Sequence, residues 1–293
     1  TDPEYRSQGL MNDLIIKALN QAKNNGACFA ALIPASESLF NYYEGTNFIS
    51  TFDYSKIRIK RQQSTGQQSA SGCQIISLQD YKNTRLQDES ELDFYQVYDY
   101  FNSKMRSRNC CIQHDEYDFG VILKDLELFD NHLLVAKYGE DICGLAFCYL
   151  RNGEIYIKDF FAESPAILTD FITTASQLFE SEAINIIVPP VSGQKTHKLG
   201  MARIIDAETM LRIYAMTHPK MKIELSIVDP ILTHNNGTYY INNGVLDKKN
   251  SIGANVVDIE QLTQALFGYN IENLPEKLQA FNKQAAFMSL MLD

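Results

Sequence analysis

The sequence is short of basic residues and contains no long hydrophobic run. Its 26 Lys and Arg residues stand against 36 Asp and Glu, so the formal net charge is −10 and the isoelectric point is near 5.0. Binding to nucleic acid or to an anionic membrane needs clustered Lys and Arg, so the charge argues against both as partners. No stretch approaches the roughly 20 apolar residues of a membrane span, and the first residues are unlike a signal peptide. We therefore expect a soluble cytoplasmic protein.

Cysteine and histidine are few and lack the spacing of common ligand motifs. The chain has six Cys and five His, with no CxxC pair and no HExxH or HxxxH motif. Most of the cysteines have apolar, strand-like neighbours, so we expect buried free thiols and no disulfides. A redox role for the vicinal pair Cys110-Cys111 is the alternative. We expect no metal site.

The length and the apolar content predict more than one globular domain. A chain of 293 residues exceeds one ordinary core, and 45% of it is hydrophobic, including 16 Phe and 16 Tyr. Two segments have linker composition, the polar run RQQSTGQQSASG at 61–72 and the Pro-Pro and Gly-containing segment 189–198. We accordingly expect domains at 1–66, 67–194 and 195–293.

Hydrophobic periodicity predicts α/β structure in the first two domains and α+β structure in the third. Helices are expected at 9–25, 36–43, 91–105, 119–128, 165–179, 205–216, 259–267 and 275–291. Strands are expected at 27–33, 48–60, 133–137, 142–150, 154–161, 184–188, 222–228, 237–242 and 256–258. Asn24-Asn25-Gly26 is a typical helix stop, and Asn242-Asn243-Gly244 is a typical hairpin turn.

The most informative local pattern lies in the first eleven residues. Arg6-Ser7-Gln8-Gly9-Leu10-Met11 places a glycine where a loop becomes a helix. Successive backbone N–H groups can then point outward at the positive end of the helix dipole. Such a helix start can bind the pyrophosphate of a cofactor, and the alternative is an ordinary polar turn.

Three segments together resemble one known family. Residues 3–10, the helix and buried strand that follow, and the segment YYEGTNF at 42–48 resemble the acetyl-CoA motif of the GNAT N-acetyltransferases and its later Tyr-x-x-x-Gly-Phe segment. Met11 replaces a usually small residue, as is typical of the branch of that superfamily named for enhanced intracellular survival. Asn47 stands where the family usually has glycine. Residues 199–206, LGMARIID, resemble the start of that branch's third domain.

The resemblance implies a fold, a cosubstrate and a reaction. The fold would be a partial GNAT domain, a second degenerate GNAT domain and a sterol-carrier-protein-like C-terminal domain. The cosubstrate would be acetyl-CoA, and the acceptor would be a primary amine on a small molecule or a peptide. The residues that would hold the cofactor pyrophosphate are Arg6, Ser7, Gln8, Gly9, Leu10 and Met11.

The resemblance also implies two catalytic groups. Tyr43 would protonate the departing CoA thiolate, with its neighbour Tyr42 as the competing candidate. The terminal α-carboxylate, here that of Asp293, would act as the general base, and the alternative is a frayed terminus. Arg203 and Asp206 could be read as a further catalytic pair, but a structural ion pair or a helix cap is the better interpretation.

Two expectations concern the beginning of the chain and the third domain. A complete GNAT domain has several strands before the cofactor loop, so we expect a truncated first domain, and the activity of the chain by itself stays open. An open sheet edge would need a cover, which favours a homo-oligomer. The competing functional hypothesis is a non-enzymatic carrier of apolar ligands, or a scaffold protein, that uses the C-terminal domain.

Overall fold

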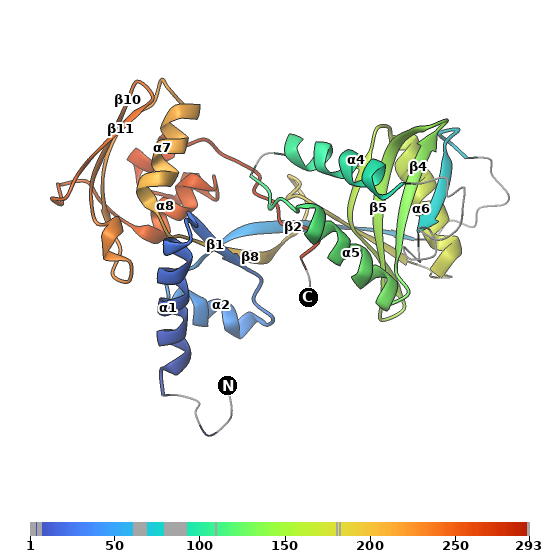
Figure 1. Ribbon diagram of the computed structural model, residues 1–293, viewed down its shortest axis with the longest axis horizontal. Helices are drawn as coiled ribbons and strands as arrows, with labels where there is room; N and C mark the ends of the chain where they lie inside the picture. Colours follow the sequence, from blue (N-terminus) through green and yellow to red (C-terminus); the bar gives the residue numbers. More distant parts are fainter. Residues whose placement is uncertain are drawn as a thin grey trace. The chain divides into compact units, whose positions relative to one another are not determined.

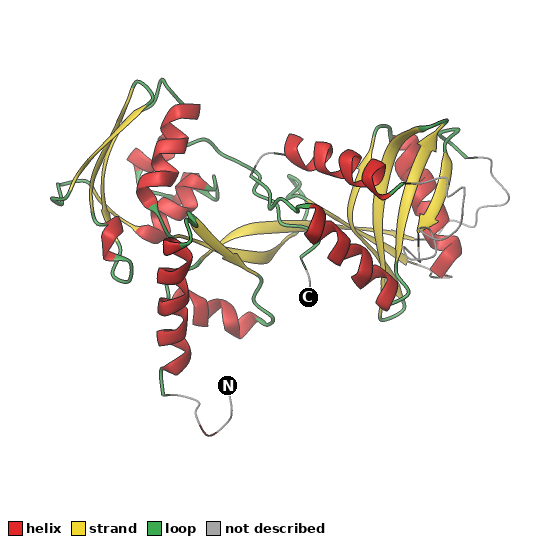
Figure 2. Ribbon diagram, in the orientation of Figure 1, coloured by secondary structure: helices red, strands yellow, loops and turns green. Residues whose placement is uncertain are grey.

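The computed structural model describes Glu4 and residues 8–60, 69–78, 93–108, 110–179, 181 and 183–291 (Figure 1, Figure 2). The chain forms two compact units. Unit 1 consists of Thr1–Asp53 with Lys198–Ala286, and unit 2 consists of Tyr54–His197 with Phe287–Asp293. Unit 1 thus combines segments that the sequence assigned to the first and third expected domains. The boundaries between the two units fall within two neighbouring strands, β2 (Ile49–Lys60) and β8 (Thr196–Ile204).

The first part of unit 1 is a set of strands covered by two helices. Its other elements are α1 (Leu10–Asn24), β1 (Phe29–Leu32) and α2 (Glu37–Glu44). The strand order is β1-β8-β2, and β1 is antiparallel to β8. Leu19 of α1 and Tyr43 of α2 belong to one apolar cluster, together with Phe48 and Met201. Gly26 follows α1 with a φ of 85°, a conformation that favours glycine, so the expected helix stop is present.

The second part of unit 1 is a four-stranded sheet in the order β11-β10-β9-β12, with β12 parallel to β9. Its elements are α7 (Ala207–Thr217), β9 (Lys222–Val228), η2 (Thr233–Asn235), β10 (Gly237–Asn242), β11 (Val245–Lys249), β12 (Val256–Asp258), α8 (Ile259–Leu266), η3 (Ile271–Asn273) and η4 (Glu276–Ala280). α7 packs on β10 and β11. Asp206 caps α7 by accepting a bond from Thr209 N, as the helix-cap interpretation predicted.

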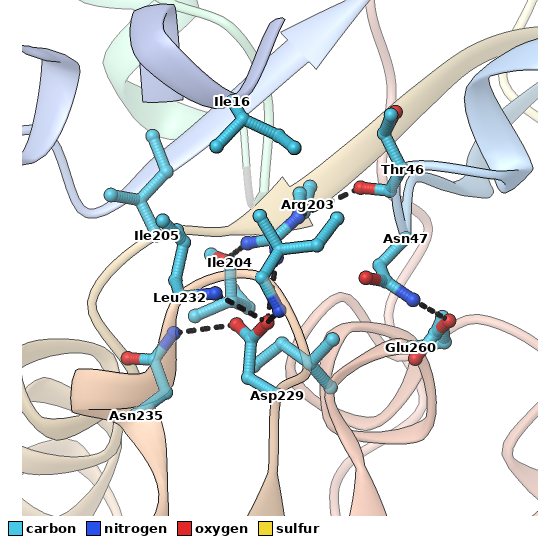
Figure 3. Close-up of polar contacts among 12 residues, drawn as sticks. Ile16, Thr46, Asn47, Arg203, Ile204, Ile205, Asp229, Leu232, Asn235 and Glu260 are labelled. Atoms are coloured by element: carbon cyan, nitrogen blue, oxygen red, sulfur yellow. Dashed lines mark hydrogen bonds and ion pairs between the residues drawn. The ribbon is translucent and has the colours of Figure 1, made fainter. Parts of the chain in front are cut away.

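A fully buried ion pair joins the two parts of unit 1 (Figure 3). Arg203 on β8 and Asp229 just beyond β9 both have 0% exposed side chains, and a guanidinium nitrogen donates to the carboxylate at 2.8 Å. The other guanidinium nitrogens donate to Thr46 O at 2.9 Å and to Ile204 O at 2.8 Å. Asp229 also accepts a bond from the Asn235 amide at 2.9 Å. Both charges are therefore fully compensated by hydrogen bonds.

Replacing Arg203 by Met should destabilise the protein strongly, because it leaves the Asp229 carboxylate buried without its counter-charge. We expect the free energy of unfolding in urea to fall by about 3–5 kcal/mol. Arg212→Met is the matched control, because Arg212 pairs with Glu208 on the surface with 55% and 41% exposed side chains. The control should change the stability by less than about 0.5 kcal/mol. Equal effects of both substitutions would contradict a structural role for the buried pair.

Unit 2 is a mixed sheet between helices, in the strand order β2-β7-β6-β5-β4-β3. Its elements are β3 (Gln74–Leu78), α4 (Phe94–Ser107), α5 (Glu116–Leu128), β4 (His132–Tyr138), β5 (Asp141–Arg151), β6 (Glu154–Ala162), α6 (Pro165–Phe179) and β7 (Ala183–Val188). β6 and β7 are parallel, and the other described pairs are antiparallel. α4 and α5 cover one face of the sheet and α6 covers the other, each above its own apolar cluster (Figure 1).

Residues 281–291, called the tail below, form an extended segment, so the expected helix over 275–291 is wrong. Only η4 forms in this range, and the backbone donors that follow it bond to distant acceptors. Gln284 N donates to Gly268 O at 3.3 Å, and Phe287 N donates to Cys110 O at 3.1 Å. An α-helix would need bonds to carbonyls four residues back, and these tertiary partners replace them.

Within unit 2 the tail is held by polar and apolar contacts. Ser289 Oγ donates to Asp159 Oδ2 at 2.6 Å, and the same carboxylate accepts two bonds of 2.6 Å from Arg108. The Nε2 atom of His114 lies 3.0 Å from Ser289 O. Leu290 belongs to the apolar cluster beneath α4 and α5 and is 4% exposed. The tail is therefore part of the core of unit 2.

Replacing Leu290 by Ala should destabilise unit 2, because it leaves a cavity in the cluster. We expect a loss of about 2–5 kcal/mol in the free energy of unfolding, measured in urea. Leu128→Ala is the matched control, since Leu128 on α5 is 77% exposed. Its effect should stay within about 0.5 kcal/mol. A Leu290→Ala variant as stable as the control would show that the tail is not packed as described.

The expected free thiols are confirmed. All six cysteines are unbonded, and three of them, Cys73, Cys143 and Cys148, are buried. The Sγ atoms of Cys73 and Cys143 lie 3.2 Å apart. In the described ranges, no helix has the combined length and hydrophobicity that crossing a bilayer requires.

Candidate functional site

The structure places the described site residues on, or just before, the two helices that cover the first strands of unit 1. Those residues are Gln8, Gly9, Leu10, Met11 and Tyr43. Arg6, Ser7 and Asp293 lie outside the described residues. Gln8 to Met11 lead into α1, and Tyr43 lies near the end of α2. Both helices contribute to the same apolar cluster, so the two candidate groups share one rigid support.

Gly9 is the residue on which the start of α1 depends. Its φ of 76° is in the left-handed region, where a side chain causes strain, and a Cβ built there would meet nothing within 4 Å. The first helical bond runs from Asp13 N to Gly9 O at 3.1 Å. The N–H groups of Leu10, Met11 and Asn12 consequently have no acceptor within the helix. This end of α1 offers backbone donors and the positive end of a dipole, which together suit an anion.

Apolar side chains flank these donors. Leu10, Met11 and Leu14 are exposed by 47%, 42% and 57%, although α1 is otherwise amphipathic. Met11, the large residue at a usually small position, therefore meets no steric obstacle in the described structure. An exposed apolar rim beside backbone N–H groups suits a ligand that combines a pyrophosphate with a less polar arm.

Tyr43 and Tyr42 lie in different environments. The Tyr43 ring contacts the rings of Tyr42 and Phe48, with centroids 5.4 Å and 5.9 Å away. Tyr43 packs against the apolar cluster, whereas Tyr42 is 39% exposed. A ring fixed by neighbours can hold its hydroxyl in one position, as an acid in catalysis must. These contacts favour Tyr43 of the two.

The backbone explains the departure at Asn47. Its φ is 62°, the left-handed conformation in which glycine is strain-free and asparagine is the best-tolerated alternative. Thr46 N and Phe48 N both donate to Tyr43 O, at 2.9 Å and 3.2 Å. The Asn47 amide also donates to Glu260 (Figure 3). Asparagine thus keeps the turn that follows Tyr43 and adds a contact to α8.

The start of helix α6 in unit 2 differs from the arrangement seen at Gly9. This helix begins with Pro165, which has no N–H group, and Ser164 Oγ accepts a bond from Ile167 N at 3.4 Å. Glu163, one residue before Ser164, forms an ion pair with Lys104 at 3.0 Å. The start of α6 is therefore closed to an anion by its own side chains, whereas the start of α1 is open.

A polar group on β2 was missed by sequence reasoning. Tyr269 OH donates to Asp53 Oδ2 at 3.2 Å. Burial raises the pKa of Asp53, and the bond from Tyr269 together with the charge of Lys198 partly opposes that rise. Burial, together with the nearby Asp53 carboxylate, raises the pKa of Tyr269 to about 12. The only sequence signal was a lone Asp in the strand ISTFDYS, which does not point to a partner 216 residues away.

Comparison with known proteins identifies the fold first. Residues 207–283 match the family model of the sterol carrier protein domain. Solved structures, among them a GCN5-related N-acetyltransferase, match almost the whole chain, and together with the match at 207–283 they confirm the expected fold class. Among curated proteins no match is found.

Three solved structures illustrate the likeness. A probable N-acyltransferase from Enterococcus faecalis V583 has a TM-score of 0.68 at 17% identity, covering 98% of this chain and 78% of that one. A GCN5-related N-acetyltransferase from Kribbella flavida has a TM-score of 0.69 at 16% identity, with 99% and 77% covered. Eis1 from Mycobacterium abscessus has a TM-score of 0.63 at 12% identity, with 99% and 77% covered. The fold is thus shared with acetyltransferases from distant bacteria.

Proposed function

We propose that this protein is an N-acetyltransferase that moves an acetyl group from acetyl-CoA to a primary amine on a small molecule or a peptide. The observation that carries the proposal is the start of α1, where left-handed Gly9 precedes three backbone N–H groups that have no acceptor within the helix. Two further observations support the proposal. The fold is shared with N-acetyltransferases. The motif that the sequence assigns to the cofactor also lies at the start of this helix.

The residues that would hold the cosubstrate are those of the loop and first turn, Arg6, Ser7, Gln8, Gly9, Leu10 and Met11. Their backbone N–H groups suit the pyrophosphate, and Gly9 leaves space for its close approach. When bound, acetyl-CoA supplies an activated thioester. The protein then needs only to orient the amine, move two protons and exclude water.

Two groups of the chain would move the protons. The Asp293 α-carboxylate accepts a proton from the neutral amine as its nitrogen forms the C–N bond, so that the amide nitrogen is left uncharged. Tyr43 donates its phenolic proton to the sulfur as the C–S bond breaks, and the leaving group departs as a thiol. The packing of Tyr43 against Phe48 supports this role, because it limits the positions of the hydroxyl.

We also propose that one cofactor site serves the whole chain. The division into domains at 1–66, 67–194 and 195–293 would make the second domain a degenerate repeat, and the closed start of α6 supports this. The match of 207–283 falls within the third domain. We further propose a cytoplasmic homo-oligomer that binds no nucleic acid or membrane, since β1 ends its strand order and the net charge is −10.

The carrier hypothesis has one supporting observation, the match to the sterol carrier protein domain. A pocket of about 540 Å³ lies in this part of unit 1, lined by Tyr214, His218, Pro219, Lys220, Met221, Lys222, Ala280 and Asn282. Two lysines in the lining do not suit an apolar ligand, because their charges would lose water on binding. The pocket therefore favours the acetyltransferase proposal over the carrier.

Replacing Gly9 by Ala should weaken acetyl-CoA binding, because the side chain strains the left-handed backbone beside the pyrophosphate site. We expect about a tenfold loss of affinity by calorimetry, equivalent to about 1.4 kcal/mol. Gly26→Ala is the matched control, since Gly26 has a φ of 85° with nothing within 4 Å but follows the other end of α1. Both variants should lose similar stability. If both lost the same affinity, the effect would be strain alone and the proposed site would fail.

Replacing Tyr43 by Phe should slow acetyl transfer in the native full-length protein without changing its affinity for acetyl-CoA. Loss of a general acid typically lowers the rate about 10²–10⁴-fold. Tyr42→Phe is the control and should leave the rate within about twofold of wild type, because Tyr42 is the more exposed ring. Steady-state kinetics with a primary amine distinguishes the two. A slow Tyr42→Phe and a normal Tyr43→Phe would reverse the assignment.

A further inference from the structure

Buried polar atoms without a hydrogen-bond partner gather on one short segment of unit 1. The structure contains six such side-chain atoms in its described residues, and four belong to Asn47, Ser50, Thr51 and Asp53. Native proteins leave few buried polar groups unpaired, so a cluster of four within seven residues requires an explanation. This segment directly follows the helix that carries Tyr43.

Two of these atoms can serve one ligand. Thr51 and Asp53 are two residues apart on β2, so their side chains leave the same face of the strand. Thr51 is 1% exposed, and Asp53 is half-buried as a residue, although its Oδ1 atom is itself buried. The unpaired atoms are Thr51 Oγ1 and Asp53 Oδ1. Ser50 lies on the opposite face and is not included.

The chemistry of the pair selects a cation that donates hydrogen bonds. An ionised carboxylate only accepts bonds, and Tyr269 already donates to its other oxygen, Oδ2. A cation beside Oδ1 would offset the desolvation that raises the pKa of Asp53. The charge of Lys198 also lowers the pKa of Asp53. The Lys198 Nζ atom itself lies over the Phe40 ring, 5.7 Å from the ring centroid.

A primary ammonium group fits these atoms better than a metal ion. It has three N–H donors on one nitrogen, enough to reach Asp53 Oδ1 and Thr51 Oγ1 together. A divalent metal would need more oxygen ligands, and across the described part of the chain no group of three His, Cys, Asp or Glu could hold one. A charged donor bound to a carboxylate also makes stronger hydrogen bonds than a neutral donor.

We propose that Asp53 and Thr51 bind the ammonium group of the amine acceptor, with Tyr269 as a positioning residue that orients the Asp53 carboxylate. Unit 1 would therefore recognise one part of the substrate, a primary alkylammonium group. The identity of the ligand as an acceptor rests on the proposed function. Its binding can be measured without any acetyl transfer.

The test measures the affinity of the native protein for n-butylammonium by calorimetry, with tetramethylammonium, which has no N–H donor, as the ligand control. Asp53→Asn should weaken n-butylammonium binding by roughly tenfold or more, the size expected for a hydrogen bond to a charged group. Thr51→Val should weaken it less. Asp247→Asn removes the same charge from the exposed strand β11 and should change the affinity less than about twofold.

Two further measurements separate binding from folding. Because the folded state raises the pKa of Asp53, its ionised form costs stability once the pH exceeds the ordinary value, so Asp53→Asn should be at least as stable as the wild type at neutral pH. Tyr269→Phe removes a bond that lowers the pKa of Asp53, so that pKa should rise further in carboxyl-carbon NMR titrations. A purely structural role for Tyr269 predicts no such rise.

The outcomes are distinct. Unchanged n-butylammonium affinity in Asp53→Asn, or equal binding of tetramethylammonium, would overturn the inference. Binding that depends on Asp53 in a protein that never acetylates an amine would leave this site standing and refute the proposed function. If Asp53→Asn acetylates amines and binds them with full affinity, the proposed function stands and the ammonium site is refuted.

Discussion

The buried charge of Arg203 is the constraint on which unit 1 depends. A guanidinium with no exposed surface must have every donor satisfied, and its partners come from the turn after α2, from β8 and from the turn after β9. Asp229 in turn accepts bonds from Ile231 N and Leu232 N. Movement of any one of these segments would leave a buried charge unpaired. The turn beside Tyr43 and the four-stranded sheet are consequently held as one body.

This constraint bears on the candidate site because the same turn leads from Tyr43 into β2. Thr46 O is bound by Arg203, Asn47 takes the left-handed conformation, and the strand then carries Thr51 and Asp53. A catalytic hydroxyl and a substrate-binding carboxylate need fixed positions more than they need stability. The buried ion pair supplies that rigidity from outside the site.

Units 1 and 2 differ in how the start of one helix is satisfied. At α1 a glycine leaves the first N–H groups open, whereas at α6 a proline removes one donor and a serine hydroxyl binds another. Two or three side chains thus decide whether the first N–H groups of a helix are satisfied locally. Unit 2 instead takes up the C-terminal tail, whose Ser289 bonds to Asp159.

Local sequence patterns predicted many elements of this fold, whereas the long-range contacts were decided by the tertiary structure. Periodicity and turn residues predicted β9, β10, α6 and the stop at Gly26, because these depend on neighbouring residues only. β11 was missed because its polar residues, VLDKK, give a weak strand signal and it forms by pairing with β10. The tail became an extended segment because its donors found distant acceptors. The contacts of Asp53 with Tyr269 and of Arg203 with Asp229 could not be predicted, because the partners are far apart in the sequence and only folding brings them together.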